Sequence, residues 1–379
     1  LIILLLYPSG CNAENETTEV SQEKIIQTQK DSVNIGKFIE EAKKYTSNVF
    51  DDIDFSELLN SAITGNIDNK ELGKGILKVV GKETLNSVRT IASIMIVIII
   101  HSILKSISEG LENQGIAKIS YYVQYILIVT LIMSNFSQVI SMVKDSVNTL
   151  IAFSNTLIPL LFTLVLTTGN MISANLLQPV LLFMVTFIGN FISNIIIPMV
   201  LASTVLGIVS KISEYVQLDK LSKFFKSSVV WILGVVLTLF VSLVSVEGSL
   251  SSSVDGITAK TAKAAVSSFI PVVGKILGDA VDTVIGCTSI LKNAVGIVGV
   301  IVILGICITP IIKLVLLMTT YYIGSAICEP IADAKIVKLL SEIGDTFRVL
   351  LAILCSLAVM LIIGTTLVMK ISNSGLMYR

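Results

Sequence analysis

Charged residues are scarce in this sequence. Only 14% of the 379 residues are Asp, Glu, Lys or Arg, against roughly 25% in ordinary soluble domains. The hydrophobic residues make up 53%, and the formal net charge is zero. With no basic excess, the charge balance does not favour a nucleic-acid partner. The composition argues against a soluble enzyme and is typical of a helical membrane protein that crosses the bilayer several times.

The residue types that carry most enzyme chemistry are also few. His101 is the single histidine, and none of the five cysteines forms a CxxC pair. This excludes histidine ligand clusters and argues against a zinc site or a disulfide framework. The GxxxxGK[ST], HExxH, GxSxG and GxGxxG motifs are all missing. We therefore expect no enzyme activity, and we predict no catalytic, cofactor-binding or metal site.

Long apolar runs dominate what is present. No charged residue occurs from Ser146 to Ser210, and a helical span needs about 20 residues, so this run alone can hold three spans. We predict an all-α polytopic membrane protein with about seven or eight transmembrane helices. The spans are expected at 89–105, 119–143, 147–166, 176–209 (two, broken near Pro198), 227–246, 293–309, 310–328 and 349–369.

The start of the chain resembles an export signal. Residues 1–11 look like the remnant of a secretory signal. A glycine before Cys11 suggests lipidation, whereas Pro8 favours ordinary cleavage nearby. Residues 12–88 should then form a polar, extracytoplasmic segment. Helical spacing occurs at Lys37–Tyr45 and Phe50–Ile63, where Phe55, Leu58, Leu59 and Ala62 share one face. We predict two or three helices that lie on the membrane or on a partner, unless the segment is a solvated leader.

Four further regions follow that segment. Residues 89–248 should hold transmembrane helices one to six, 249–292 an amphipathic helical insert, and 293–370 helices seven to nine, with a short pair broken at Pro310. Residues 371–379 form the last region. Lysine-rich loops are usually cytoplasmic, which places 105–118, 211–226 and the 371–379 tail inside and the insert outside.

The insert carries most of the candidate functional residues. Pro271 suits the first turn of a helix, on which Lys275, Asp279 and Asp282 share one face. Gly274 and Gly278 stand four residues apart, which allows two backbones to approach closely. We predict that this helix serves assembly or lines a conduit. The alternative is a helix that only lies at the membrane surface.

Three polar residues within predicted spans each allow two readings. Lys313, one turn into its span, either extends to the membrane surface or is a buried charge, and we count it as a candidate assembly or conduit residue. Asn190 and Asn194 share one helix face and either bond a neighbouring helix or line a polar path.

An ordered set of short motifs lies between about residues 210 and 331. The motifs are Asp255-Gly256, Thr261-Ala262-Lys263, FIPVVGK at 269–275, Asp279-Ala280, KNAVG at 292–296, PIIK at 310–313 and Glu329-Pro330-Ile331. Together they resemble the stage III sporulation protein AE family. The family's usual Gln before the last of these prolines is Glu329 here.

This resemblance implies a function. Family members work in endospore-forming bacteria, in the mother-cell membrane facing the forespore, as subunits of a channel (secretion-like) complex. We therefore expect a structural or conduit role, with other stage III sporulation membrane proteins and the lipid bilayer as partners and no nucleic acid. The alternative is a stand-alone secondary transporter or permease for a small solute. It is supported by the span count, the breaks at Pro198 and Pro310, and the amphipathic insert.

Overall fold

The structure is a computed structural model that describes residues 25–30, 33, 35–47, 49–50, 53–66, 69–109, 114–212, 217–269 and 273–371. All the regular structure of these residues is helical. The elements are α2 (Ile35–Thr46), α3 (Phe55–Thr64), α4 (Asn69–Glu109), α5 (Gln114–Thr167), α6 (Met171–Phe191), the π-helix η2 (Ile192–Ile196), α7 (Ile197–Ile212), α8 (Asp219–Phe269), α9 (Val273–Cys328) and α10 (Ala334–Ile371).

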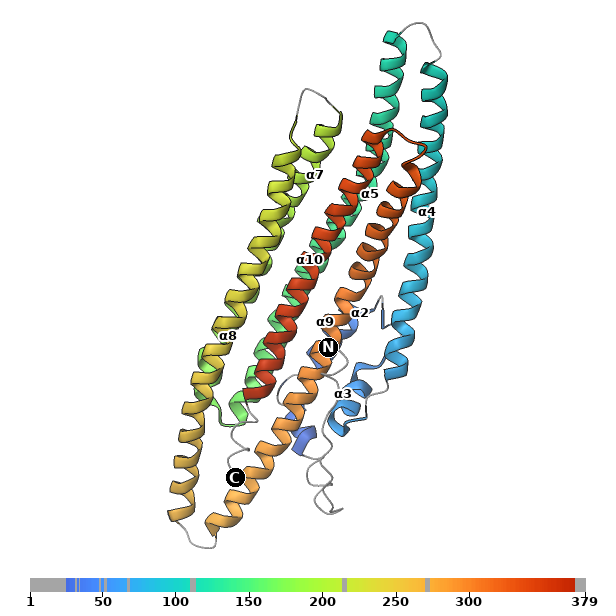
Figure 1. Ribbon diagram of the computed structural model, residues 1–379. Coiled ribbons are helices and arrows are strands. Elements are labelled where there is room, and N and C mark those ends of the chain that lie inside the picture. Colours follow the sequence, from blue (N-terminus) through green and yellow to red (C-terminus); the bar gives the residue numbers. More distant parts are fainter. Residues whose placement is uncertain are drawn as a thin grey trace.

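The long helices form one elongated bundle and alternate in direction (Figure 1). α4 ends, and α5 begins, at the same end of the bundle as the α7–α8 and α9–α10 connections. The α5–α6 connection, the start of α9 and the end of α10 lie at the opposite end. The beginning of α4 and the end of α10 therefore share one end of the bundle.

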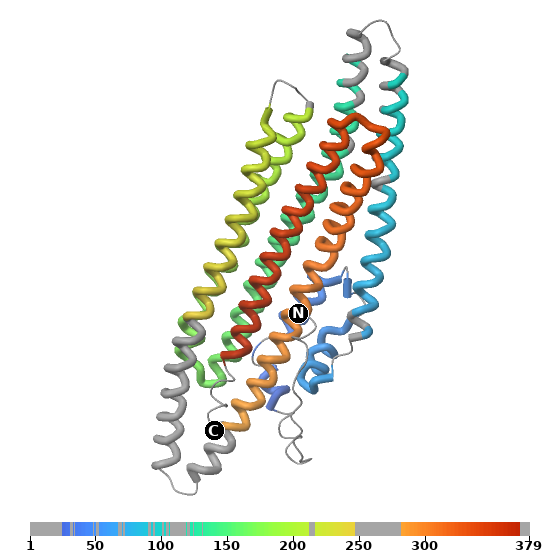
Figure 2. The backbone as a smooth tube through the Cα atoms, in the orientation of Figure 1, coloured from blue at the N-terminus to red at the C-terminus, as the bar shows by residue number. Residues whose placement is uncertain are grey.

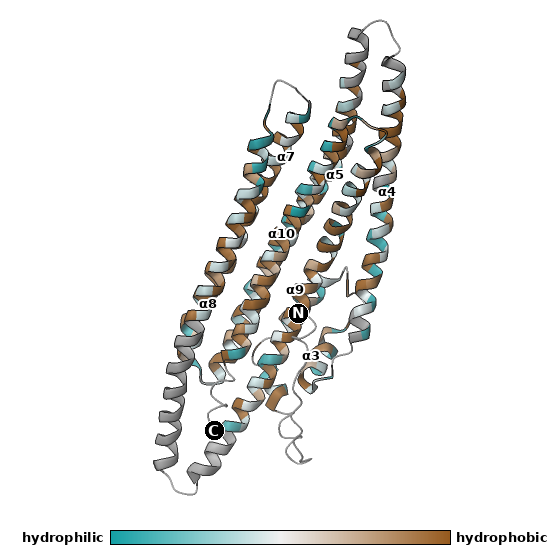
Figure 3. Ribbon diagram, in the orientation of Figure 1, coloured by the Kyte–Doolittle hydropathy of each residue, from teal (hydrophilic) through white to brown (hydrophobic). Residues whose placement is uncertain are grey.

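Five helical segments are long and apolar enough to cross a membrane: Tyr125–Thr167, Met171–Lys211, Asp219–Val246, Asp282–Cys328 and Ala334–Ile371. Apolar residues run along much of their length (Figure 3). On α8 the side chains of Phe224, Trp231 and Leu239 are 63%, 69% and 64% exposed. A water-soluble bundle would bury such residues, so this face is suited to lipid.

Three pairs of predicted spans are each one continuous helical run. The predicted spans 119–143 and 147–166 both lie in α5, because no Gly or Pro interrupts the stretch around Lys144 and Asp145. These charges lie on an exposed face of the helix and not in a loop. At 1.5 Å per residue, the 54 residues of α5 extend about 80 Å, far beyond the roughly 30 Å hydrocarbon layer.

The two prolines expected to separate spans are accommodated inside helical runs. Pro198 is the second residue of α7 and follows the π-helix η2 directly, where the wider turn leaves room for a ring that would clash in a regular α-helix. Pro310 lies inside α9, which continues to Cys328. Neighbouring helices allow such prolines in membrane helices. The expected short pair meeting at Pro310 is therefore a single helix.

α10 is the central helix of the bundle. It packs against α5, α7, α8 and α9, and it buries side chains along its whole length, from Ile336 to Ile371. Its Phe347 ring lies 6.0 Å from the Phe136 ring of α5 and 5.4 Å from the Tyr321 ring of α9. Most of the residues between the predicted spans 310–328 and 349–369 form the first part of this helix, since α10 already begins at Ala334.

The described N-terminal helices pack on the bundle. α2 and α3, blue in Figure 2, lie beside α9, and α2 also contacts α5. Phe38 stacks near Phe153 of α5, with 5.9 Å between ring centres. The predicted amphipathic face of α3 is confirmed, because Phe55, Leu58 and Leu59 are buried. This segment is therefore attached to the protein and is not a solvated leader.

A glycine permits the close contact between the N-terminal segment and α9. A Cβ atom on Gly305 would lie 2.8 Å from Cε2 of Phe50 and 2.9 Å from Cγ2 of Thr46, closer than carbon atoms pack. A Cβ atom on Gly286, in the same helix, would meet nothing within 4 Å.

We predict that Gly305→Val loosens the N-terminal segment, because the added methyl groups displace Phe50 and Thr46. Limited proteolysis of the purified protein should then cut the region of α2 and α3 several-fold faster, as expected for a lost packing contact. Gly286→Val, the matched control, should be cut at the wild-type rate. Equal cutting of both variants would show that Gly305 does not hold this segment.

Candidate functional site

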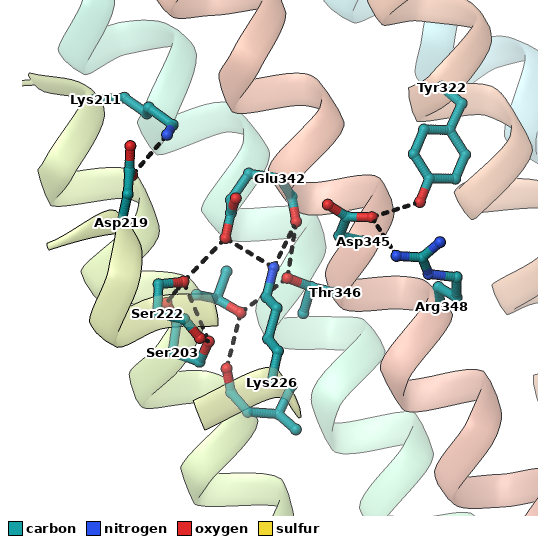
Figure 4. Close-up of polar contacts among 12 residues, drawn as sticks. Ser203, Lys211, Asp219, Ser222, Lys226, Tyr322, Glu342, Asp345, Thr346 and Arg348 are labelled. Atoms are coloured by element: carbon teal, nitrogen blue, oxygen red, sulfur yellow. Dashed lines mark hydrogen bonds and ion pairs between the residues drawn. The ribbon is translucent and has the colours of Figure 1, made fainter. Parts of the chain in front are cut away.

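A buried group of polar side chains joins α7, α8 and α10 inside the bundle (Figure 4). Each helix contributes polar residues spaced three or four apart, which places them on one helix face. α8 contributes Ser222 and Lys226, α10 contributes Glu342 and Thr346, and α7 contributes Ser203, Thr204 and Gly207. We refer to these seven residues as the polar network.

An ion pair lies at the centre of the polar network. Lys226 Nζ is 2.8 Å from Oε1 of Glu342 and also donates to the backbone carbonyl of Glu342 at 3.0 Å. Ser222 donates its hydroxyl hydrogen to the same Oε1 at 3.0 Å. Both charged residues are only 9% exposed, so Glu342 receives its polar contacts from the protein.

Hydroxyl groups extend the polar network to α7. The Ser203 hydroxyl donates to the Ser222 carbonyl at 2.7 Å, and the Ser222 hydroxyl lies 2.8 Å from the Ser203 carbonyl. The Thr204 and Thr346 hydroxyls are 3.0 Å apart. These four residues are at most 1% exposed. Their mutual bonds supply partners that a membrane interior lacks.

Gly207 makes the room that Glu342 needs. A Cβ atom at this position would lie 2.5 Å from Oε1 of Glu342. Any larger residue on this turn of α7 would therefore push the carboxylate away from Lys226. The glycine is required for the close approach of the α7 backbone to α10, and not for an unusual backbone conformation.

The polar network holds three candidate membrane helices together in one specific arrangement. Removing a buried charge from water is costly, and the cost is offset only when the pair has good geometry and further hydrogen bonds. Both conditions are met here. Breaking the pair would leave an isolated charge among apolar helices, which is costly.

This site was not predicted from the sequence. Lys226 falls in the predicted 211–226 loop and Glu342 between the predicted spans 310–328 and 349–369, yet both lie within candidate spans. The local signal was the four-residue spacing of Ser222 with Lys226 and of Glu342 with Thr346. Without the packing of α8 on α10, nothing in the sequence pairs these two charges.

A second polar region lies on the exposed side of α5. Asn148 accepts a hydrogen bond from Ser193 of η2 at 3.2 Å, and Asn155 lies 3.4 Å from the Thr186 hydroxyl of α6. The exposed polar residues Ser134, Ser137, Gln138, Ser141, Lys144, Asp145, Asn148 and Asn155 follow one side of α5. We call them the α5 polar stripe.

Asn190 and Asn194 are exposed on α6 and η2. We predicted that these asparagines either bond a neighbouring helix or line a polar path, and their exposure agrees with the second. The contacts between α5 and the neighbouring polar side chains are made by Asn148 and Asn155.

Lys292, the first residue of the KNAVG motif, is another buried cation. The residue is 0% exposed, and its Nζ donates to the Met369 carbonyl at 2.6 Å. Met369 lies in the last turn of α10, where carbonyl groups lack helical partners. A cation is stabilising at that position, next to the negative end of the helix dipole.

The structure locates only some of the predicted site residues. Pro271 lies outside the described residues, and α9 begins two residues later at Val273. Gly274, Lys275, Gly278 and Asp279 lie in the first turns of α9, but their side chains are outside the described set. Asp282 and Lys313 are half-buried on the same helix. The polar network includes none of these residues.

We predict that Glu342→Gln destabilises the protein by about 3–5 kcal/mol, because it leaves Lys226 buried without its counter-charge. The measurement is chemical unfolding of the purified protein in detergent. The double variant Lys226→Met with Glu342→Leu should lower the free energy of unfolding much less, since it removes both charges.

The exposed pair of Asp345 and Arg348, 2.8 Å apart, supplies the control. Asp345→Asn should cost only about 0–1 kcal/mol, as is usual for surface ion pairs. If Glu342→Gln lowers the free energy of unfolding by no more than this control does, the polar network does not stabilise the bundle.

Comparison with known proteins identifies relatives of this chain. The family model for stage III sporulation protein AE matches residues 53–372. The stage III sporulation protein AE of Bacillus subtilis (strain 168) is 29% identical over 306 residues, which cover 81% of this chain and 77% of that protein. No solved structure matches. The matched segment contains the whole polar network.

Proposed function

Because the chain belongs to the stage III sporulation protein AE family, we propose that it is a membrane subunit of a mother-cell/forespore channel complex required for endospore development. The family match is the observation that carries this proposal, because it covers residues 53–372 and implies a role in sporulation. The role proposed within the complex is structural or conduit-forming rather than catalytic. The other subunits would be stage III sporulation membrane proteins.

Three features of the structure support a structural or conduit role. Five apolar helical segments can cross a membrane, and the polar network holds three of the helices in a fixed arrangement. The α5 polar stripe is exposed on a candidate membrane helix. Polar and charged residues on such helices usually face water or protein and not lipid. The stripe therefore fits a helix that borders an aqueous path or a partner subunit.

A second candidate function is that of a secondary transporter for a small solute. A polar cavity between α2, α5 and α9 favours it, because this cavity includes Pro310 in the middle of a candidate span. Transporter binding sites are often built at interruptions of membrane helices. Such a protein would act without the other stage III subunits, which separates the two proposals experimentally.

We predict that the tagged protein co-purifies with other stage III sporulation membrane proteins from sporulating cells, and that it hydrolyses no nucleotide when purified alone. Gly274→Leu combined with Gly278→Leu should abolish co-purification while membrane insertion and protein level are kept, since leucines block close helix approach. Isolation of the wild-type protein without partners would favour the transporter.

The control for this experiment is Gly286→Leu, at a position where an added Cβ atom meets nothing within 4 Å. This variant should co-purify with the same partners as the wild type. If the Gly274 and Gly278 variant also assembled normally, the beginning of α9 would be a passive connector.

The direction of the helices bears on membrane topology. The start of α4 and the end of α10 lie at one end of the bundle (Figure 1). We propose that both are extracytoplasmic, with the α7–α8 connection cytoplasmic as its lysines favour. The sequence analysis expected a cytoplasmic 371–379 tail, most of which is outside the described residues. With the predicted span 89–105 in α4 counted as a crossing, merging three pairs of predicted spans removes three crossings and reverses the expected side of this end.

Cysteine labelling in intact cells tests this topology on a background without the native cysteines. Lys74→Cys in α4 and Lys370→Cys in α10 should both react with a membrane-impermeant thiol reagent, and Lys220→Cys should not. All three residues are exposed, so accessibility depends on the side of the membrane. If Lys74→Cys and Lys370→Cys failed to react with this reagent, the proposed topology would be wrong.

A further inference from the structure

A cavity of about 570 Å³ lies between α2, α5 and α9, midway along two candidate membrane spans. Its volume is far larger than the share of about 30 Å³ that one water molecule occupies in the liquid. The cavity is lined by Tyr45, Val49, Ser137, Gln138, Ser141, Met142, Asp145, Ser146, Thr149, Gly305, Ile306, Thr309 and Pro310. It lies along the α5 polar stripe, and Tyr45 and Val49 of the N-terminal segment line another side of it.

The lining is rich in oxygen atoms that accept hydrogen bonds. α5 contributes a carboxylate from Asp145 and hydroxyls from Ser141 and Thr149, among others. No Lys or Arg occurs among the lining residues. Such a lining repels anions and suits a hard cation, because hard cations prefer oxygen ligands.

Two oxygen atoms of α9 also favour a bound cation. Pro310 has no backbone N–H, so the carbonyl of Ile306, one turn earlier, loses its helical partner. Ile306 lines the cavity. The adjacent Thr309 hydroxyl oxygen is buried and has no hydrogen-bond partner among the described residues. Buried polar groups without partners are rare in folded proteins, and a bound water or ion is one explanation of such a group.

We propose that this cavity binds a monovalent inorganic cation, such as Na⁺ or K⁺, with part of its hydration shell. The ligands would be the Asp145 carboxylate, the Thr309 hydroxyl and the Ile306 carbonyl, with neighbouring α5 hydroxyls and water completing the coordination. A divalent ion fits less well, because protein sites for Ca²⁺ and Mg²⁺ commonly use more than the single carboxylate present here.

This site goes beyond a role in a channel complex and does not depend on it. Cation binding is a property of the isolated chain, whereas the proposed function requires partner proteins. Binding to the purified protein therefore tests the cavity alone, and co-purification from sporulating cells tests the complex alone.

The experiment uses the full chain purified in detergent, with radioactive ²²Na⁺ in equilibrium dialysis and K⁺ as competitor. Saturable ²²Na⁺ binding is expected, displaced by unlabelled Na⁺ or K⁺ and not by choline. Asp145→Asn should weaken binding by about tenfold or more, and Thr309→Val by several-fold, as expected for lost ligands. Absence of saturable binding to the wild-type protein would overturn the proposal.

Asp345→Asn is the matched control, because its carboxylate lies on α10, bonded to Tyr322 and Arg348, and does not line the cavity. It should bind ²²Na⁺ as the wild type does. If Asp145→Asn bound ²²Na⁺ as tightly as the wild type does, the proposed site would also be wrong.

A second measurement keeps the test decisive if Asp145→Asn fails to fold. Met142→Cys, at a lining residue without an oxygen ligand and on a background free of other cysteines, should react with a small thiol reagent several-fold more slowly in Na⁺ than in choline, as expected when a ligand occupies a site. Equal rates in the two salts would argue against a cation in this cavity.

Discussion

A charged side chain within an apolar helical bundle needs a partner from the protein itself, because the membrane interior supplies neither water nor counter-ions. This requirement organises the part of the structure where α7, α8 and α10 meet. Lys226 and Glu342 form a 2.8 Å ion pair, and Gly207 gives Glu342 the space to make it. Since α10 is the central helix, fixing its position against α7 and α8 also orients the surfaces that face α5 and α9.

The same requirement is met differently in other parts of the bundle. Lys292 uses a free carbonyl at the end of α10, and the asparagines of the α5 polar stripe use side chains of α6 and η2. Where α5 faces the cavity, the carboxylate of Asp145 and the hydroxyl of Thr309 remain for a ligand. The polar groups thus divide into those that join helices and those that face space between them.

Helix length sets a second constraint. A helix such as α5 is far longer than the hydrocarbon layer is thick, so part of each long helix must be covered by protein or project beyond the lipid. The packing of α2 and α3 on α9 shows how the N-terminal segment covers part of that length. A subunit that projects from the membrane in this way has surface for contacts with other proteins, which suits the proposed membership of a complex.

The sequence by itself determined the helical class, the apolar runs long enough to cross a membrane, the sporulation family and the amphipathic face of α3, because composition, ordered motifs and helical periodicity are local properties. It did not determine how many helices those apolar runs form. Lys144 and Asp145 are compatible with a loop or with an exposed helix face, and Pro310 with a break or with a continuous helix, until neighbouring helices are in place. The pairing of Lys226 with Glu342 was likewise decided only by tertiary structure, since residues separated by more than a hundred positions meet only when α8 packs on α10.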